Sequence, residues 1–455
     1  MKRLEPLVRH PVAIAGAVLA TASAVLFIVM VIAALAGLFE NPYAGLVVFV
    51  GLPGLFVLGL LLIPLGMRLQ RRKLARDPSA PADWPIIDFR RPEVRRTTLV
   101  VTALTAVNVV ILLLAGYGSL HWMESPSFCG QVCHTPMHPQ FTSWQQAPHA
   151  KVACVRCHIG EGASSFVHAK LAGVRQLVHV ATNNVPKPVP PGADMPPGEQ
   201  ARTCTGCHQP WRSVGDEIRV KREFADDEPN TETKTILQMH LGAASPSGRS
   251  IHWHANPSTR VEYVAADEKR ETITAVRVTD AKGQVKEFVA DDAKPEAVSA
   301  GTWRSMDCID CHNTVGHPIA PTPELAVDRA IAANQIDRKL PFARREAVRL
   351  VKAGYSSQEE GLSAIERELR SFYGSRGSID QQALARTVTG VQDAYRHNVF
   401  PTMKVTFGAY PDNRGHTTST GCFRCHDDSH TAKDGSKISA DCEYCHKQIE
   451  APEGS

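Results

Sequence analysis

The chain has 455 residues, with 50 Lys and Arg against 46 Asp and Glu, and its length allows several domains. The formal net charge of +4 is small and much of the basic excess lies in one short loop, which argues against nucleic acid as a partner. Aromatic residues make up only 6% and prolines number 31, so the chain has fewer side chains for a core of its own than most proteins of this length.

Three apolar segments occupy the first 120 residues, from about Pro11 to Phe39, from about Ala44 to Met67 and from about Thr97 to Leu120. Each is long enough to cross a bilayer core of about 30 Å as a helix, and none has a charge in its interior. The first follows three basic residues, but it exceeds the apolar core of a signal peptide, which is about 7–15 residues long. We therefore predict three retained transmembrane helices.

The loop between the second and third segments is rich in arginine, whereas the loop around Glu40 and Pro42 has no Lys or Arg. Basic loops stay on the cytoplasmic side of a membrane. This rule places the amino terminus in the cytoplasm, and three crossings then deliver residue 121 onward to the outer side. The basic residues of the loop are Arg68, Arg71, Arg72, Lys73, Arg76, Arg90, Arg91, Arg95 and Arg96.

Six cysteine pairs, each followed at once by a histidine, use all twelve cysteines of the chain. Five have the spacing C-x-x-C-H, the attachment signature of c-type haem, in which both thiols bond to the porphyrin and the histidine ligates its iron. The pattern predicts six covalent haem c groups on the periplasmic side of a bacterial cytoplasmic membrane. In chain order the sites are Cys129, Cys133 and His134 (site 1); Cys154, Cys157 and His158 (site 2); Cys204, Cys207 and His208 (site 3); Cys308, Cys311 and His312 (site 4); Cys422, Cys425 and His426 (site 5); and Cys442, Cys445 and His446 (site 6).

Structural zinc and dithiol redox centres also use closely spaced cysteines. Neither chemistry requires a histidine directly after the second cysteine. Histidine is only 19 of 455 residues, so its presence after all six pairs is not a chance result. Haem attachment is therefore the preferred interpretation.

The sequence from Glu124 to about Leu177 resembles the NapC/NirT/NrfH family of membrane-anchored, quinol-oxidising multihaem cytochromes, and the resemblance is clearest over about residues 124–210. The resemblance implies a first haem near the membrane surface that receives electrons from quinol, with methionine as an iron ligand in one branch, and a periplasmic redox partner. The resembling residues are Ser125-Pro126-Ser127-Phe128-Cys129-Gly130, Cys133-His134, Met137, His149 and Cys154-Val-Arg-Cys157-His158.

Site 1 departs from the family pattern, because three residues separate its cysteines and Met137 is four positions after Cys133 rather than three. The longer spacing loosens the geometry that places His134 under the iron. Met137, His134 and His138 are then all candidate axial ligands, and Met137 has apolar packing beside the porphyrin as its alternative role.

Residues 162–179 have apolar positions at helical spacing, which predicts an amphipathic helix that can lie on a membrane surface. By resemblance, Lys170 in this helix is a candidate quinol-site residue, and contact with lipid headgroups is its alternative role. Residues 184–203 are rich in proline and predict a semi-extended connector.

Alternating residues predict strands over 260–264, 271–278 and 285–289, with a turn at Ala281-Lys-Gly. Just before them, His252 and His254 are separated by one residue and would face the same way on a strand. We expect this sheet to carry one haem ligand. Residues 323–397 predict amphipathic helices without cysteine, which serve for packing or docking.

Each of six haems leaves one further coordination position, and twelve histidines lie outside the motifs after the spans. Most haems are therefore expected to have two histidine ligands. His317 and His149 are each only five residues from a motif, too close to reach the far side of that motif's own haem, so each is expected to ligate a neighbouring haem. The candidate distal ligands are His149, His254, His317, His416 and His430.

The expected fold is three amino-terminal transmembrane helices followed by a multihaem domain that is mostly α-helical and irregular, with a small antiparallel β insert. The expected function is quinol oxidation at the outer membrane face with relay of electrons to a periplasmic acceptor. A terminal reductase with one open haem and an anchor subunit of a larger membrane complex are the alternatives. The expected segments are 1–120 (anchor), 121–215 (sites 1–3), 216–300 (β insert), 301–400 (site 4 and helices) and 401–455 (sites 5 and 6).

Overall fold

The computed structural model describes residues 10–35, 47–74, 89–132, 134–159, 163–190, 199–213, 215–242, 250–377 and 379–449. The chain divides into two compact units, Met1–Cys133 and His134–Ser455, and each is described by itself. The finer division into five segments stays a prediction.

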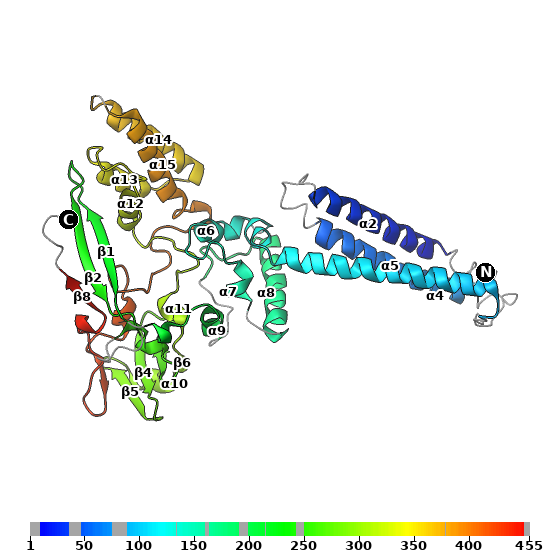
Figure 1. Ribbon diagram of the computed structural model, residues 1–455, viewed down its shortest axis with the longest axis horizontal. Coiled ribbons are helices and arrows are strands. Elements are labelled where there is room, and N and C mark those ends of the chain that lie inside the picture. Colours follow the sequence, from blue (N-terminus) through cyan, green and yellow to red (C-terminus); the bar gives the residue numbers. More distant parts are fainter. Residues whose placement is uncertain are drawn as a thin grey trace. The chain divides into compact units, whose positions relative to one another are not determined.

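The first unit consists of three long helices, α2 (Pro11–Leu35), α4 (Leu52–Leu74) and α5 (Pro92–Met123), with a π-helical turn η1 (Val47–Gly51) before α4 (Figure 1). All three are long and apolar enough to cross a membrane, as the sequence predicts. The beginning of the second expected span, around Ala44, lies outside the described residues.

Helices α2 and α4 pack closely through small residues. A Cβ atom on Gly66 would lie 2.3 Å from the backbone nitrogen of Ala13, and one on Gly59 would lie 2.6 Å from that of Ala20. Only glycine permits such an approach between two helix backbones, which is how apolar helices gain contact area in lipid. The outward side chains of both helices remain exposed for lipid.

The second unit begins with short helices separated by irregular chain. The attachment motifs at sites 2 to 6 each coincide with, or begin in, one helical turn. The elements of this part are η2 (Phe128–Val132) in the first unit and, in the second, α6 (His134–Trp144), α7 (Cys154–His158), α8 (Ala163–Ala181), α9 (Glu199–Thr205), η3 (Pro210–Arg212), η4 (Ile251–Ala255), α10 (Pro295–Ala300), α11 (Cys308–Cys311), η5 (Pro401–Met403), η6 (Gly421–Arg424) and η7 (Cys442–Tyr444).

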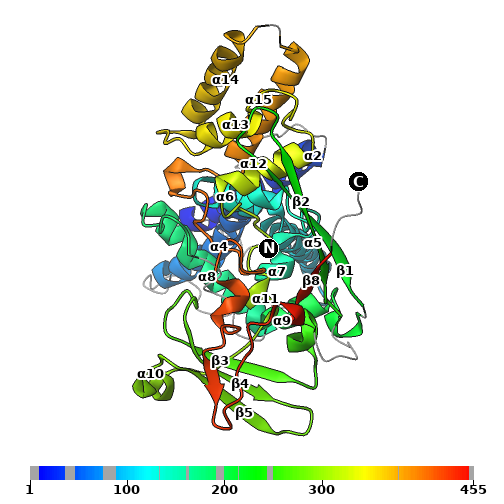
Figure 2. The same ribbon diagram turned by 90° about the vertical axis from the view of Figure 1, so that its left-hand side faces the viewer.

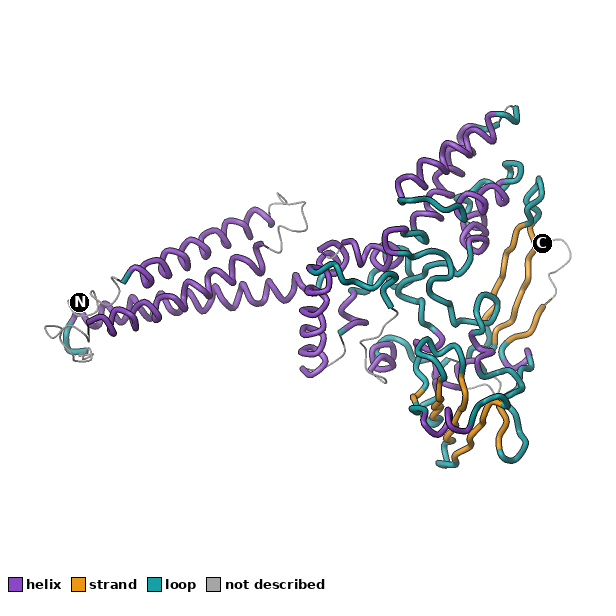
Figure 3. The backbone as a smooth tube through the Cα atoms, turned by 180° about the vertical axis from the view of Figure 1, so that it is seen from behind, coloured by secondary structure: helices purple, strands orange, loops and turns teal. Residues whose placement is uncertain are grey.

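Two antiparallel sheets follow site 3, and Figure 3 shows their strands in orange. The larger sheet has the order β6-β3-β4-β5-β7 and the smaller one the order β1-β2-β8. The three predicted strands are confirmed as β3, β4 and β5, whereas β1 and β2 were not predicted. The strands are β1 (Glu217–Phe224), β2 (Glu232–Met239), β3 (Arg260–Ala265), β4 (Ile273–Thr279), β5 (Val285–Ala290), β6 (Arg304–Ser305), β7 (His430–Ala432) and β8 (His446–Ile449).

The carboxy-terminal segment supplies the last strand of both sheets: β7 pairs with β5, and β8 pairs with β2 (Figure 2). Sites 5 and 6 are therefore built into the same sheets that follow site 3. The paired residues lie 140 to 144 positions apart in the first case and 207 to 213 positions apart in the second.

Four helices form a separate apolar core: α12 (Pro323–Ala332), α13 (Ala343–Val351), α14 (Gln358–Gly374) and α15 (Gln381–Arg396). Fully buried residues such as Leu350, Ile365, Leu369 and Tyr395 fill it. The prediction of amphipathic helices over 323–397 is confirmed. The expected fold class is also confirmed.

Candidate haem-binding site

The described cysteines have the form that haem attachment requires. In a helical turn, residues three apart lie on one face, so C-x-x-C directs both sulfurs to the same side. No disulfide joins any two of the eleven cysteines that the structure describes, and Cys133 lies outside that part of the chain.

Five motif histidines each lie opposite a histidine from elsewhere in the chain. The distances between ring centres fall in the narrow range of 5.9 to 6.2 Å. The pairs are His158 with His317 (6.1 Å), His208 with His149 (6.0 Å), His312 with His252 (6.2 Å), His426 with His254 (5.9 Å) and His446 with His416 (6.1 Å).

This separation fits a metal held between two imidazoles. A metal–nitrogen bond is about 2 Å and an imidazole centre lies roughly 1 Å beyond its nitrogen, so two rings on opposite sides of one iron have centres roughly 6 Å apart. Among the described residues, no group of three or more His, Cys, Asp or Glu side chains converges as a bare metal ion would require. Two facing imidazoles beside two thiols match the donor set of a c-type haem.

Backbone carbonyls orient several of these rings through Nδ1. This nitrogen of His252 lies 2.8 Å from the Leu241 oxygen, and that of His317 lies 2.9 Å from the Gln140 oxygen. A ring that donates from Nδ1 to a carbonyl presents an unprotonated Nε2, the form that ligates a metal. His254 and His426 make the same kind of contact with Ile251 and Ser439.

Burial favours the neutral form of five of the paired imidazoles. It lowers the pKa of His158, His254 and His317, and it also lowers those of His312 and His446. A neutral imidazole is the state that binds a metal, because a protonated ring has no free lone pair.

His252 and His254 differ from the expectation of one ligand on a strand. They lie in the 3₁₀ turn η4, which points the two rings at different motif histidines, His312 and His426. The alternation rule of a strand does not apply to a 3₁₀ turn, so both rings meet partners. The sequence contained both residues but gave no signal for the turn.

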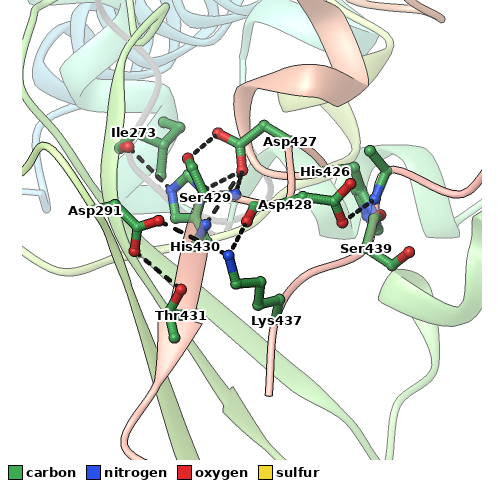
Figure 4. A network of polar contacts seen from close by, with 11 residues as sticks. Ile273, Asp291, His426, Asp427, Asp428, Ser429, His430, Thr431, Lys437 and Ser439 are labelled. Carbon is green, nitrogen blue, oxygen red and sulfur yellow. Dashed lines mark hydrogen bonds and ion pairs between the residues drawn. The ribbon is translucent and has the colours of Figure 1, made fainter. Parts of the chain in front are cut away.

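In the part of the chain that the structure describes, His430, a candidate distal ligand, has a protein oxygen as the partner of each ring nitrogen rather than a motif histidine. Its Nδ1 lies 2.9 Å from a carboxylate oxygen of Asp427 and its Nε2 lies 3.1 Å from the carbonyl oxygen of Ile273 (Figure 4). The side chain is 1% exposed. With both nitrogens bound to protein oxygens, His430 fixes β7 against β4 and has no lone pair directed at an iron.

The pairs link the sites to one another. His149 is close in sequence to site 2 and faces the site 3 histidine, while His317 is close to site 4 and faces the site 2 histidine. His252 and His254 join sites 4 and 5 through one turn, and His416 lies six residues before Cys422 of site 5 and faces His446 of site 6. Five sites therefore form one connected group.

Thiol and backbone contacts agree with this connection. A hydrogen bond between the thiols of Cys204 (site 3) and Cys308 (site 4) raises the pKa of the first and lowers that of the second. The carbonyl oxygen of Asp310, inside the site 4 motif, accepts hydrogen bonds from Arg424 of the site 5 motif (2.6 Å) and from Asn413 (3.1 Å).

Site 1 is described only in part. Cys133 and the side chain of His134 lie outside what the structure describes. Met137 is half-buried in α6, and the ring of His138 packs edge-on against Phe400 at 5.1 Å. The choice of axial ligand at site 1 stays a prediction.

The predicted helix over 162–179 is confirmed as α8. Val167, Leu171, Val174 and Val178 form one stripe along it, and each side chain is more than half exposed. The Lys170 ammonium lies beside this stripe, 4.9 Å from the centre of the Phe166 ring.

Comparisons with known proteins agree with this geometry. The sequence matches the NapC/NirT cytochrome c family, N-terminal region, over residues 91–188. It is 35% identical to cytochrome c-type protein ImcH of Geobacter sulfurreducens over 451 residues, which cover 97% of this chain and 88% of that protein. It is 42% identical to cytochrome c-type protein Cgr1 of Eggerthella lenta over 61 residues, or 13% of this chain and 26% of that protein. No solved structure matches the chain.

Three membrane-spanning helices joined to a unit with repeated cysteine–histidine attachment sites define a membrane-anchored multihaem c-type cytochrome, a class that transfers electrons. The similarity to a c-type cytochrome extends over nearly the whole chain. The chain belongs to the NapC/NirT family of c-type cytochromes.

Proposed function

We propose that this protein carries six covalent haems, oxidises quinol (menaquinol in particular) at the outer face of the bacterial cytoplasmic membrane and relays the electrons to a periplasmic acceptor. The observation that carries this proposal is the set of five facing histidine pairs, because each pair would provide one imidazole for either side of a haem at sites 2 to 6. Haem, when bound, supplies one-electron redox chemistry at each site.

These histidine pairs would hold a haem iron closed at the five sites. An iron with a histidine on each face has no open position for a substrate, so these sites favour electron transfer over reduction of a small molecule. The shared segments keep neighbouring sites at fixed positions, as a relay requires. The ligand links give the connected order 3–2–4–5–6, and the contact between Cys204 and Cys308 adds a direct link between sites 3 and 4.

Helix α8 supports a membrane-surface role in the second unit. Its stripe of four exposed aliphatic side chains is costly in water and gains free energy in the acyl–headgroup boundary of a bilayer. Lys170 and Arg175 flank the stripe on opposite sides, where they suit anionic headgroups. We assign Lys170 to the quinol-binding region on this basis and on family resemblance.

The Arg-rich loop after α4 supports the proposed orientation of the protein in the membrane. Its cytoplasmic placement puts the end of α5 on the outer side, which is also where c-type haems are attached. Protection of this loop from added protease in sealed vesicles of known orientation tests the proposed topology.

The experiment that tests the function uses the full-length holoprotein in nanodiscs. A soluble menaquinol analogue is added and haem reduction is followed at the α band, with and without a quinone-site inhibitor. Lys170→Met is expected to lower the rate roughly tenfold, because a charge-assisted hydrogen bond contributes about 1.5–3 kcal/mol. Lys282→Met, in the exposed turn between β4 and β5, is the matched control. If neither the inhibitor nor Lys170→Met lowers the rate of haem reduction, the proposal that quinol is oxidised at this region is rejected.

A further inference from the structure

The small sheet β1-β2-β8 has one apolar face. Val220, Ile236 and Ile449 are directly opposite one another across the three strands, and Ile218 lies two residues along β1 on the same side. Residues paired in register point to the same side of a sheet. We call these four residues the apolar sheet face.

The apolar sheet face is exposed. Ile218 and Val220 are each more than half exposed, and Ile236 and Ile449 are half-buried. Within the described residues, only the Phe224 end of β1 enters a hydrophobic core, that of the helix bundle. A continuous aliphatic row on a protein surface indicates an interaction site.

Positive charge is concentrated around the same face. Lys447 is paired in register with Gln238 and Lys234 with Arg222, so these three cations flank the aliphatic row. Arg222 lies 3.5 Å from Glu232, whereas no ion pair is found for Lys234 or Lys447 in the part of the chain that the structure describes.

The opposite face of the sheet is electrically balanced. There, Arg219 pairs with Glu217 at 2.9 Å and Lys221 pairs with Glu223 at 3.0 Å. The contrast between the faces means that an approaching negative surface is attracted to the apolar side.

This sheet also contains the last site of the connected order. His446 is the first residue of β8, and Ile449 lies three residues further, about 10 Å along the strand. The histidine points to the balanced face, so a protein on the apolar face would be separated from site 6 by the thickness of the sheet. This step rests on the proposed ligation of site 6 by His446 and His416.

We propose that the apolar sheet face is where electrons leave the protein, and that its partner is a small acidic redox protein. One electron passes from the reduced site 6 to the oxidised centre of the partner, which is reduced by one electron, and no bond or proton changes at this chain. An aliphatic centre with a cationic rim gives the weak, salt-sensitive and short-lived complex that electron transfer needs.

The test uses the full-length holoprotein, reduced with dithionite so that the quinol step is not involved. Stopped-flow mixing with oxidised flavodoxin, a small acidic flavoprotein, gives a second-order rate constant at low and high salt. A basic monohaem cytochrome c is the probe of opposite charge. The variant Lys234→Glu with Lys447→Glu reverses two charges on the proposed face, and Arg219→Glu with Lys221→Glu reverses two charges on the other face.

We expect flavodoxin to react faster at low salt and to slow as salt rises. Reversing Lys234 and Lys447 should lower that rate roughly tenfold, as loss of electrostatic steering does. The control pair should change it less than about twofold. Val220→Ser should also slow the reaction, with the haem content and spectrum unchanged.

Three outcomes would overturn the proposal. One is an equal effect of the two charge-reversal variants, or a faster reaction with the basic probe. Another is that the protein forms a dimer and that Val220→Ser dissociates it, in which case a second copy of this chain occupies the apolar sheet face. The third is a large rate increase on deleting residues 450–455, which would make the acidic tail with Glu450 and Glu453 the occupant. A failure of quinol oxidation alone would leave all these results unchanged.

Discussion

The turn η4 leads to a specific prediction, because it places two histidines at two different sites. His252 faces His312 at 6.2 Å and His254 faces His426 at 5.9 Å. Replacing either by alanine should remove one axial ligand from one haem and leave the other site intact. The expected change is therefore conversion of one haem to the high-spin state for each single variant, and of two haems for the double variant.

The fold should survive these replacements. Each ring makes one hydrogen bond from Nδ1 to a carbonyl, 2.8 Å long in both cases, and loss of such a bond costs about 0.5–1.5 kcal/mol. That cost is small against a typical domain stability of about 5–15 kcal/mol. The haem contacts would be retained through the two thioether bonds of each site.

The assay is electron paramagnetic resonance of the oxidised protein, with the high-spin signal integrated against total haem. Added imidazole should restore the low-spin spectrum of each single variant, and His254→Met should instead raise the reduction potential of one haem. His397→Ala is the matched control, because His397 lies outside the five pairs and contacts Asp393 and Gln146. If either His252→Ala or His254→Ala leaves every haem low-spin, the two-site assignment is refuted and a single ligand in this turn is correct.

Three further predictions concern residues outside the ligand pairs. His430→Leu should leave the haem spectrum unchanged but lower the free energy of unfolding by about 1–3 kcal/mol, because two protein oxygens lose their partner. Gly361→Ala should destabilise the helix bundle by about 1–3 kcal/mol in thermal unfolding, since its Cβ would lie 2.5 Å from the Tyr395 ring. Arg424→Met should weaken the magnetic coupling between the haems of sites 4 and 5, because Arg424 donates to the carbonyls of Asp310 and Arg270.

For each of these three predictions, one experimental result would contradict the reasoning. A new high-spin signal in His430→Leu would restore that residue as a ligand. Gly374→Ala is the control for the bundle, because its Cβ has open space, and equal destabilisation by both glycine variants would contradict the close-contact argument. Unchanged coupling in Arg424→Met would show that the sheet alone holds sites 4 and 5 together.

The sequence alone determined the features that depend on local spacing. Apolar length fixes a membrane span, so three helices were predictable. The distance between two cysteines and the following histidine fixes an attachment site, because all three groups lie within one turn of chain. Alternation predicted β3, β4 and β5 for the same reason.

Only the tertiary structure decided which histidines face each other. His158 and His317 are 159 positions apart, and no periodicity relates residues at that distance. His254 and His430 both looked like spare histidines near a motif, yet one faces a motif imidazole and the other is bound on both nitrogens by protein oxygens. The pairing of β7 and β8 with strands formed much earlier in the chain brings sites 5 and 6 to their partners, and such long-range pairing is selected by packing free energy rather than by local sequence.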